Sequence, residues 1–398
     1  MELVVMLRRI PFDRPEPMVV APEFRQLQES GEILQVRTPA GHLGWLVTRH
    51  DDVIRMLSDE RFERAHPDPV SAPVLSDAGQ FYGPQGTDGD RLEDEFRILR
   101  RATANSLSVR RVRQLRPRIE ELVSLRLDQL EAAGPPADLH SLLAEPLPVD
   151  VVCELLGVPA ADRDEFQVWT ADVVYLAEPD RVIDALGKLN DYMRPLMARK
   201  RLEPAEDALT ELVRAQQAGL IDENLAVLWS VALLFAGHVT TVTRIGTGVL
   251  HLLAHPEQRR EMLSGPDLLA ATVDELLRVS QQDLGLVWRW AAVDVETRGG
   301  LIKAGDLVLF ANGPACLDPT AYPEPDRFDI HREQGPHTAF GAGPHLCVGA
   351  ALARLELQVV FELLFRRFPG LRLAVPEEGL RWRDSQLTGG LLELPVTW

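Results

Sequence analysis

The residue best suited to do chemistry in this chain is Cys347, which lies in the glycine-rich run 340–349 directly before a helix-patterned segment. A helix N-terminus carries partial positive charge and N–H groups without intrahelical partners, and both lower the pKa of a nearby thiol. Gly341, Gly343 and Gly349 allow the backbone to approach a flat ligand and to point N–H groups at the sulfur. A thiolate held in this way is a strong axial donor to haem iron. The structural alternative is a buried free cysteine in a glycine-rich turn.

A second candidate region is the helical pattern between Asp222 and His255. Asp222 is a suitable N-cap, and the pair His255-Pro256 ends the pattern. The apolar stretch 225–237 is too short to span a bilayer and ends in polar residues. We therefore predict a buried central helix that carries the run 236–241, Ala-Gly-His-Val-Thr-Thr.

A third candidate is the pair Glu275 and Arg278. Residues three apart on a helix share a face and can form an ion pair. Exposed pairs of this kind are common and contribute little to stability, so the pair alone does not indicate a site. Whether this pair marks a functional site depends on the other motifs in the sequence.

The run around Cys347 resembles the cysteine-ligand loop of the cytochrome P-450 family, F-x-x-G-x-x-x-C-x-G. Phe340, Gly343, Cys347 and Gly349 fill every fixed position. The resemblance extends from about Gly31 to the C-terminus and is similar to soluble bacterial members without a membrane anchor. It implies a mainly helical, triangular fold with a small β-rich lobe, with Cys347 as the proximal ligand of haem b iron.

The resemblance also gives the pair Glu275 and Arg278 a role. It is similar to the family's E-x-x-R pair, which joins a downstream arginine in a buried network behind the haem. Arg327, in Pro325-Asp326-Arg327-Phe328, matches that arginine, and the three motifs follow in the family's order. A nearby departure is 315–319, Ala-Cys-Leu-Asp-Pro, where A-N-R-D-P is usual, and Cys316 is expected to be a buried structural thiol.

On the predicted central helix, the run 236–241 resembles the family's A-G-x-(D/E)-T-T. Thr240 matches the threonine whose hydroxyl can hydrogen-bond the oxygen being activated and open the local helix. Val239 stands where the family has an acid that relays protons, so ordinary proton delivery is in doubt. His238 occupies the variable position and is not expected to be a ligand. The expected catalytic positions are Thr240, Thr241, Gly237 and Ala236, the last two leaving room for dioxygen.

The resemblance implies a set of haem contacts. The propionates are anions that need cationic partners at the edge of the pocket. Phe96 replaces a histidine that the family often has four residues before the first arginine, so the cationic set is expected to be one member smaller. The expected cofactor-binding residues are Arg100, Arg289, His337, Phe340, Gly341 and Gly349.

Composition limits the class of protein. The 398 residues are expected to form one domain, 1–398, because helical patterns with short connections run through most of the chain. A net charge of -18 argues against nucleic acid as a partner. The stretch 3–6 is too short for a signal core or a membrane span, and the three cysteines suit neither a disulfide framework nor zinc. A monomer in a reducing cytoplasm is expected.

One basic stretch contrasts with this acidic background. Residues 97–118 contain eight arginines and no acid, which is either a solvated helix face or a docking patch. The resemblance implies that electrons pass from NAD(P)H through a ferredoxin reductase to a small acidic ferredoxin. We expect the ferredoxin to dock here, with Arg97 and Arg101 in contact.

Local patterns predict the remaining elements. Strands are expected at 33–36, 46–48, 293–296, 301–302, 306–310, 371–373 and 391–396, and helices at 51–57, across most of 92–277, and at 349–368. Residues 65–95 are rich in Pro, Gly, Asp and Ser, and a loop of this length is usually functional or mobile. We interpret it as a substrate flap.

Three functions remain open from the sequence. The first is monooxygenation of a small molecule or peptide, in bacterial secondary metabolism. The second is oxidative crosslinking of phenol or indole groups in a peptide or cyclic dipeptide, without oxygen insertion, which the missing acid at Val239 favours. The third is a haem-binding module without turnover. The pocket is expected to include the flap, segments 166–191 and 282–287, and Val239, Val287, Trp288, Leu387 and Thr388, although the two tryptophans flanking Arg289 could equally be core residues.

Overall fold

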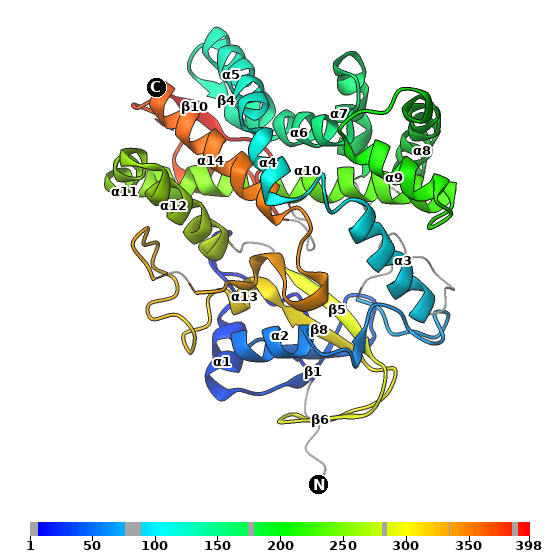
Figure 1. Cartoon of the computed structure of the whole chain (residues 1–398). Coiled ribbons are helices and arrows are strands. Elements are labelled where there is room, and N and C mark those ends of the chain that lie inside the picture. Colours follow the sequence, from blue (N-terminus) through cyan, green and yellow to red (C-terminus); the bar gives the residue numbers. More distant parts are fainter. Residues whose placement is uncertain (1–6, 76–88, 174–178, 281–284, 334, 384–388) are drawn as a thin grey trace. The chain divides into compact units, whose positions relative to one another are not determined.

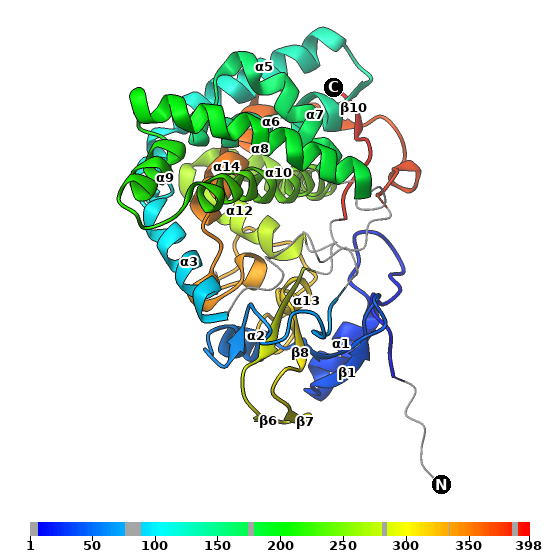
Figure 2. The same ribbon diagram turned by 90° about the vertical axis from the view of Figure 1, so that its right-hand side faces the viewer.

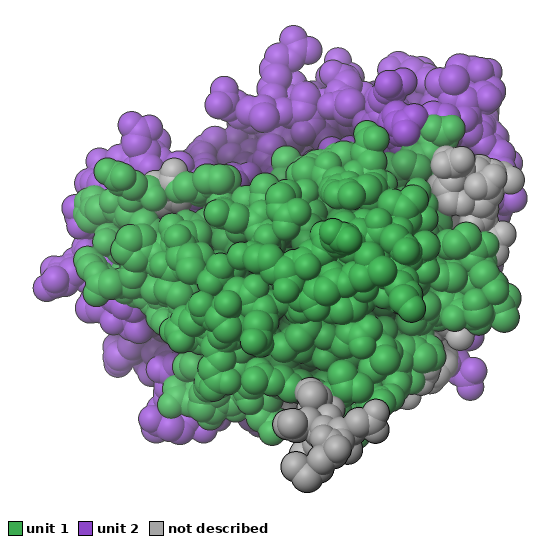
Figure 3. Space-filling model, turned by 90° about the horizontal axis from the view of Figure 1, so that it is seen from below, with its two compact units in different colours: residues 1–94, 277–347, 384–389 green, residues 95–276, 348–383, 390–398 purple. Residues whose placement is uncertain are grey.

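The structure, a computed structural model, describes residues 7–75, 89–173, 179–280, 285–333, 335–383 and 389–398. The chain divides into two compact units, coloured separately in Figure 3. Unit 1 comprises residues 1–94, 277–347 and 384–389, and unit 2 comprises 95–276, 348–383 and 390–398. Each unit therefore combines segments that are distant in the sequence.

Unit 1 is organised around a five-stranded sheet with the order β1-β2-β8-β5-β3. The pair β2/β8 is parallel, and the other neighbours are antiparallel. Strands β8 and β5 lie side by side in the yellow part of the ribbon in Figure 1. The strands are β1 (Leu34–Arg37), β2 (Leu43–Val47), β3 (Phe62–Glu63), β5 (Leu286–Ala291) and β8 (Leu307–Ala311).

Side chains of β8 fill an apolar cluster on each face of this sheet. Val308 and Phe310 belong to one cluster, whereas Leu307 and Leu309 belong to the other. Successive residues of a strand point to opposite faces, so a strand covered on both sides must be apolar throughout. Burial of every β8 residue fits this position at the centre of the sheet.

The helices of unit 1 are short. They are α1 (Pro22–Ser30), α2 (His50–Leu57) and α13 (Asn312–Ala315), and β6 (Val295–Thr297) pairs with β7 (Gly300–Ile302) in a separate hairpin. The prediction of a helix at 51–57 is confirmed by α2. The turn 38–41 between the first two strands is closed by the N–H of Gly41, which donates to the carbonyl of Thr38 at 2.9 Å.

Unit 2 is built on the long helix α10 (Glu223–Ala254). Asp222 caps it, since its Oδ1 accepts from the N–H of Leu225 at 2.7 Å, as predicted. In both ribbon views α10 runs among its neighbours α6 (Pro146–Leu156), α8 (Pro179–Leu202) and α14 (Ala350–Arg367) (Figures 1 and 2). Among the described helices, α10 alone is long and apolar enough to cross a membrane. Half of its most apolar 18-residue stretch (50%) is buried inside the protein.

Small residues allow α10 to pack closely on its neighbours. A Cβ atom at Gly248 would lie 2.4 Å from the ring of Phe361 on α14, so a side chain there would displace an aromatic core residue. The other elements of unit 2 are α4 (Val109–Gln114), α5 (Arg116–Ala133), α7 (Arg163–Val173), α9 (Ala208–Gln217), α11 (Pro256–Glu261), a π-helical turn (His140–Ala144) and the sheet β4 (Ala137–Asp138), β10 (Pro395–Thr397), β9 (Arg372–Leu373). Helices α3 (Gly89–Ala102) and α12 (Pro266–Val279) contain residues of both units.

Candidate functional site

The loop that carries Cys347 is closed by its own backbone. The N–H of Cys347 donates to the carbonyl of Phe340 at 2.9 Å, so the two ends of the loop are joined. Gly341 has a φ of 74°, a region that residues with side chains rarely adopt. A Cβ at Gly343 would lie 2.7 Å from the carbonyl oxygen of Leu57 at the end of α2. The glycines therefore set both the turn and its close approach to a helix.

Cys347 is the exposed thiol of the three in the chain. Burial raises the pKa of the Cys153 thiol to about 12, which keeps it protonated. The Sγ of Cys316 is buried 3.3 Å from both the carbonyl of Asn312 and the hydroxyl of Thr338. Cys316 therefore has the structural position that the sequence predicted, and Cys347 is the cysteine accessible to a ligand.

Arg289 is a buried cation on β5. Burial lowers its pKa to about 10, repulsion from Arg64 adds to the shift, and Glu93 opposes it. Burial also lowers the pKa of Arg64, again against the attraction of Glu93. The Nε2 atom of His345 lies 3.3 Å from Glu93 as well. A buried cation that is repelled by a second, partly buried cation favours an anionic ligand. Neither Arg64 nor Glu93 belongs to a sequence motif, so the sequence did not predict their contribution.

His337 precedes the short helical turn 338–340 and packs on the loop. Its ring lies 5.8 Å from the ring of Phe340, tilted by 40°. Both ring nitrogens are buried in the structure. Neither nitrogen is accessible to a ligand in this arrangement, so the contact of His337 with a propionate stays a prediction.

In unit 2, one face of α10 is exposed although most of the helix is buried. Ala232, Ala236 and Thr240 are spaced four residues apart and form this exposed stripe. The hydroxyl of Thr240 donates to the carbonyl of Ala236 at 2.8 Å. Val239 and His238 point elsewhere and are 5% and 3% exposed. The exposed stripe of the helix therefore consists of two alanines and one threonine hydroxyl.

His238 is held away from that stripe. Its Nε2 lies 3.2 Å from the carbonyl oxygen of Glu145, which can only accept, so Nε2 carries the proton. Burial lowers the pKa of His238 to about 4, and the positive charge of Arg383 acts in the same direction. A neutral, buried imidazole agrees with the expectation that His238 is not a ligand.

Arg100 lies on α3 in unit 2. Its guanidinium is 5.6 Å from the centre of the Phe96 ring, which packs edge-on against Trp229 at 5.6 Å. Phe96, which replaces the histidine expected at this position, therefore supports Arg100 as an aromatic platform rather than as a second donor.

Comparison with known proteins identifies the family. Residues 180–377 match the family model Cytochrome P450. The chain is 42% identical over 397 residues to the pentalenolactone synthase of Streptomyces exfoliatus, covering 98% of this chain and 99% of the relative. It is 39% identical over 399 residues to the mycinamicin IV hydroxylase/epoxidase of Micromonospora griseorubida, covering 98% of each.

The chain belongs to the cytochrome P450 family. Its structure is similar to the crystal structure of cytochrome P450 MoxA from Nonomuraea recticatena, with a TM-score of 0.88, 36% identity and 98% of each chain covered. The predicted fold class, mainly α with a small β-rich part, is confirmed. The chain is accordingly a P450 oxidoreductase, and the family implies haem and dioxygen.

The residues of this P450 fit haem within each unit. Unit 1 offers an exposed thiol in a glycine-turned loop, together with a buried arginine and a partly buried arginine that favour an anion. Unit 2 offers an exposed stripe of small residues with one hydroxyl. A soft sulfur donor, cations for carboxylates and an uncrowded helix face are the groups that haem requires.

Gly237 lies where two helices of unit 2 approach closely. A Cβ at Gly237 would lie 2.6 Å from the side chain of Val152 on α6. Helix packing therefore requires a small residue here, and the expected role of Gly237 in leaving room for dioxygen beside Ala236 stays a prediction.

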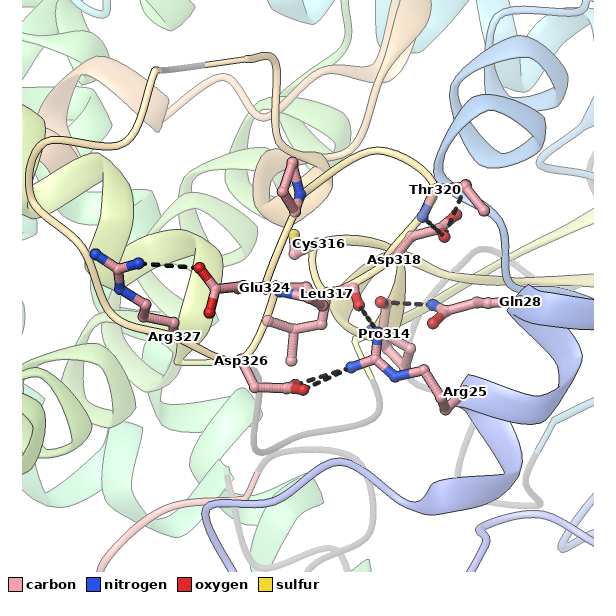
Figure 4. A network of polar contacts seen from close by, with 12 residues as sticks. Arg25, Gln28, Pro314, Cys316, Leu317, Asp318, Thr320, Glu324, Asp326 and Arg327 are labelled. Atoms are coloured by element: carbon pink, nitrogen blue, oxygen red, sulfur yellow. Dashed lines mark hydrogen bonds and ion pairs between the residues drawn. The ribbon is translucent and has the colours of Figure 1, made fainter.

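Arg327 was expected to be the third member of the buried network of Glu275 and Arg278, and the structure shows which of its groups takes part. Arg278 is 2% exposed and donates to the carbonyls of Cys316, Pro325 and Arg327 at 3.0, 2.7 and 3.3 Å. The guanidinium of Arg327 is 59% exposed and binds Glu324 at 3.0 Å (Figure 4). It also binds Asp329 at 3.2 Å. Nearby acids in its own segment attract it, so only its main chain belongs to the buried network.

The segment around Arg327 is also tied to α1. Arg25 donates to both carboxylate oxygens of Asp326 at 2.9 Å and to the carbonyl of Leu317 at 2.7 Å (Figure 4). Gln28 of the same helix donates to the carbonyl of Pro314 at 2.8 Å. These contacts fix the long connection after β8, which carries no regular structure over most of its length.

The predicted substrate contacts are only partly visible. Leu387 and Thr388 lie outside the described residues, as do 76–88 of the flap and 282–284 of the segment 282–287. Trp288 packs against the apolar cluster that contains Leu307 and Leu309, and Val287 packs against the opposite cluster with Phe310. Both remain partly accessible, so core packing accounts for much of their surface.

Proposed function

We propose that this P450 is a haem-thiolate monooxygenase of bacterial secondary metabolism that acts in the cytoplasm. The observation that carries the proposal is the exposed thiol of Cys347 in a loop closed by the bond between its N–H and Phe340. The named activity of the mycinamicin IV relative supports oxygen insertion. When bound, haem supplies the reductive activation of dioxygen.

The proposed roles of the chain's residues follow from their chemistry. The Cys347 sulfur would hold the iron, and Gly341, Gly349 and Phe340 would contact the cofactor. Arg289, Arg100 and His337 would bind propionates, and Arg64 is added to this set because it is a partly buried cation whose charge acts on Arg289. The Thr240 hydroxyl, which donates to the Ala236 carbonyl, would be the hydrogen-bond donor for a bound oxygen species, and Thr241 supports the same turn. Electrons come from NAD(P)H through a ferredoxin reductase and a small acidic ferredoxin.

A carbon monoxide spectrum of the reduced protein tests this proposal. Thiolate ligation shifts the Soret band to longer wavelength than imidazole ligation, so wild type should show the red-shifted band. Cys347→His should move the band to the imidazole position. The matched controls Cys316→Ser and Cys153→Ser should keep the red-shifted band. Folded wild-type protein without pigment, or with an imidazole-type band, would show that the proposal is wrong.

Val239 supports a second candidate reaction, the oxidative crosslinking of aromatic groups. Valine neither donates nor accepts protons, and its side chain is buried beside the exposed stripe of α10. A phenol or indole substrate supplies two hydrogen atoms from its own O–H or N–H groups. These hydrogen atoms leave with the second oxygen atom as water, so the substrate is coupled without oxygen insertion.

Val239→Glu should distinguish the two reactions. If Val239 limits proton delivery, wild type should release hydrogen peroxide alongside hydroxylated product, and Val239→Glu should raise the ratio of product to peroxide by roughly tenfold, since positioned proton transfer contributes at least that much. Val239→Leu is the matched control and should behave as wild type. Tight coupling of NAD(P)H oxidation to hydroxylation in wild type would remove the argument for crosslinking.

A further inference from the structure

Two side chains of unit 1 hold the same backbone carbonyl, that of Pro336. The Nε2 atom of His50 lies 2.7 Å from this oxygen, and the hydroxyl of Tyr322 donates to it at 2.9 Å. A carbonyl oxygen only accepts, so Nε2 of His50 carries a proton. Pro336 lies eleven positions before Cys347 in the sequence. It begins the segment 336–340, which leads into the cysteine loop.

Both donors are fixed by their surroundings. The buried carboxylate of Asp318 accepts from the backbone N–H of His50 at 2.8 Å, which sets the start of α2. The rings of His50 and Tyr322 meet edge to face at 5.4 Å, and the guanidinium of Arg278 lies 5.1 Å from the Tyr322 ring. The other ring nitrogen of His50 faces Asp51, whose side chain is 98% exposed, so that contact contributes little.

The segment after Pro336 passes this constraint to the cysteine loop. The hydroxyl of Thr338 donates to the carbonyl of Asn312 at 2.7 Å, which ties the segment to α13. The N–H of Gly341 donates to the carbonyl of Thr338 at 2.8 Å, and the N–H of Cys347 donates to that of Phe340 at 2.9 Å. These bonds follow one another along the segment that begins at Pro336. Movement of Pro336 would therefore strain the bond of Thr338 and, through residues 338–341, displace the Phe340 carbonyl that orients Cys347.

We propose that His50 and Tyr322 are positioning residues that, by holding the Pro336 carbonyl, keep Cys347 in place as an iron ligand. This inference rests on the proposed function. The two donors share one acceptor, so loss of either leaves a bond in place. The segment should loosen fully only when both are lost.

The experiment compares His50→Phe, Tyr322→Phe and the double variant, which keep the ring shapes but lose the donors. Two readouts are measured on the haem-loaded proteins: the rate of haem transfer to excess apomyoglobin, and the fraction of the reduced carbon monoxide complex that lacks the thiolate-type Soret band. We expect small effects from the single variants. In the double variant we expect haem transfer about fivefold faster, as loss of roughly one net hydrogen bond implies, and a clear rise in the second fraction.

Two control variants separate positioning from general damage. His50→Gln keeps a donor and, combined with Tyr322→Phe, should restore both readouts toward wild type. Thr320→Val removes a hydroxyl that binds Asp318 at 2.8 Å in the same network but does not touch Pro336, and it should leave both readouts unchanged.

The outcomes distinguish this inference from the proposed function. A wild type without the thiolate-type band would overturn both. A normal wild-type spectrum, with a double variant that matches wild type in both readouts, would overturn the positioning role alone. So would an equal effect of Thr320→Val. If the double variant does not fold, the two single variants in 1 M urea replace it, and wild-type behaviour there would also count against the proposal.

Discussion

Glu356 is a carboxyl group enclosed in unit 2, on the helix that follows the cysteine loop. It is 2% exposed, and within the described part of the chain its Oε1 has no hydrogen-bond partner. Burial raises its pKa to about 8, and repulsion by Asp150 acts in the same direction. Asp150 is itself paired with Arg126 at 2.6 Å. Glu356 is therefore protonated in the folded protein at neutral pH.

This carboxyl should make the folded protein less stable as the pH rises. Above about pH 4.5 the unfolded chain releases the proton, whereas the folded chain retains it up to about pH 8. Across that window the free energy of unfolding falls by about 1.4 kcal/mol for each pH unit. Glu356→Gln keeps the shape and removes the titration. Its stability relative to wild type should rise by about 3 kcal/mol between pH 5 and pH 8 in urea unfolding.

Glu362→Gln is the matched control for this prediction. Glu362 is on the same helix but is partly exposed and paired with Arg116 at 2.8 Å and Arg366 at 3.3 Å. Its replacement should not reproduce the pH-dependent gain. Parallel pH profiles for wild type and Glu356→Gln would contradict the raised pKa.

At the scale of single residues, local motifs could be predicted and spatial partners could not. The position of Cys347 followed from ten consecutive residues, because the glycines and the following helix are all local. Arg64, Glu93 and Arg289 come from separate parts of the chain. Their charges interact only because the fold brings these residues near one another. The packing of Gly237 could not be predicted for the same reason, since its neighbour Val152 lies on another helix.

At the scale of elements, helices with strong caps and periodic apolar residues were predicted well. Helix α10 begins and ends where Asp222 and Pro256 indicated, and the predicted helix at 349–368 corresponds to α14. Their signals lie within the elements themselves. The central helix was also correctly expected to be largely buried.

Strands depended on partners that the sequence does not reveal. Strand β5 (Leu286–Ala291) was not predicted, although two tryptophans alternate in it with Arg289. It is a strand because it lies between β8 and β3, which are distant from each other in the chain. The predicted strand at 46–48 was too short, since β2 extends from Leu43 to Val47 along both β1 and β8. Pairing over such sequence separations overrides local preference.

At the scale of the whole molecule, the strongly acidic chain has one basic stretch, residues 97–118. Some of its arginines form ion pairs within unit 2, and others have exposed side chains. Some arginines are neutralised by acids of unit 2: Arg111 by Glu206, Arg116 by Glu120 and Glu362, and Arg118 by Glu121 and Glu154. Others, Arg97, Arg101, Arg110 and Arg113, are exposed. We expect an acidic ferredoxin to be attracted by these exposed side chains, which include both predicted contacts, Arg97 and Arg101.

Charge reversal at Arg101 should therefore slow reduction by ferredoxin. Exposed charges attract over about one Debye length, roughly 10 Å at 0.1 M salt. We expect Arg101→Glu to lower the second-order rate of reduction by roughly tenfold at low salt, and the difference from wild type to shrink as salt rises, since steering is screened. Stopped-flow reduction under carbon monoxide measures both. Arg372→Glu, an equal charge change at an exposed arginine of β9, should have a much smaller effect. Equal slowing by the two variants would mean that net charge, rather than this surface, controls the encounter.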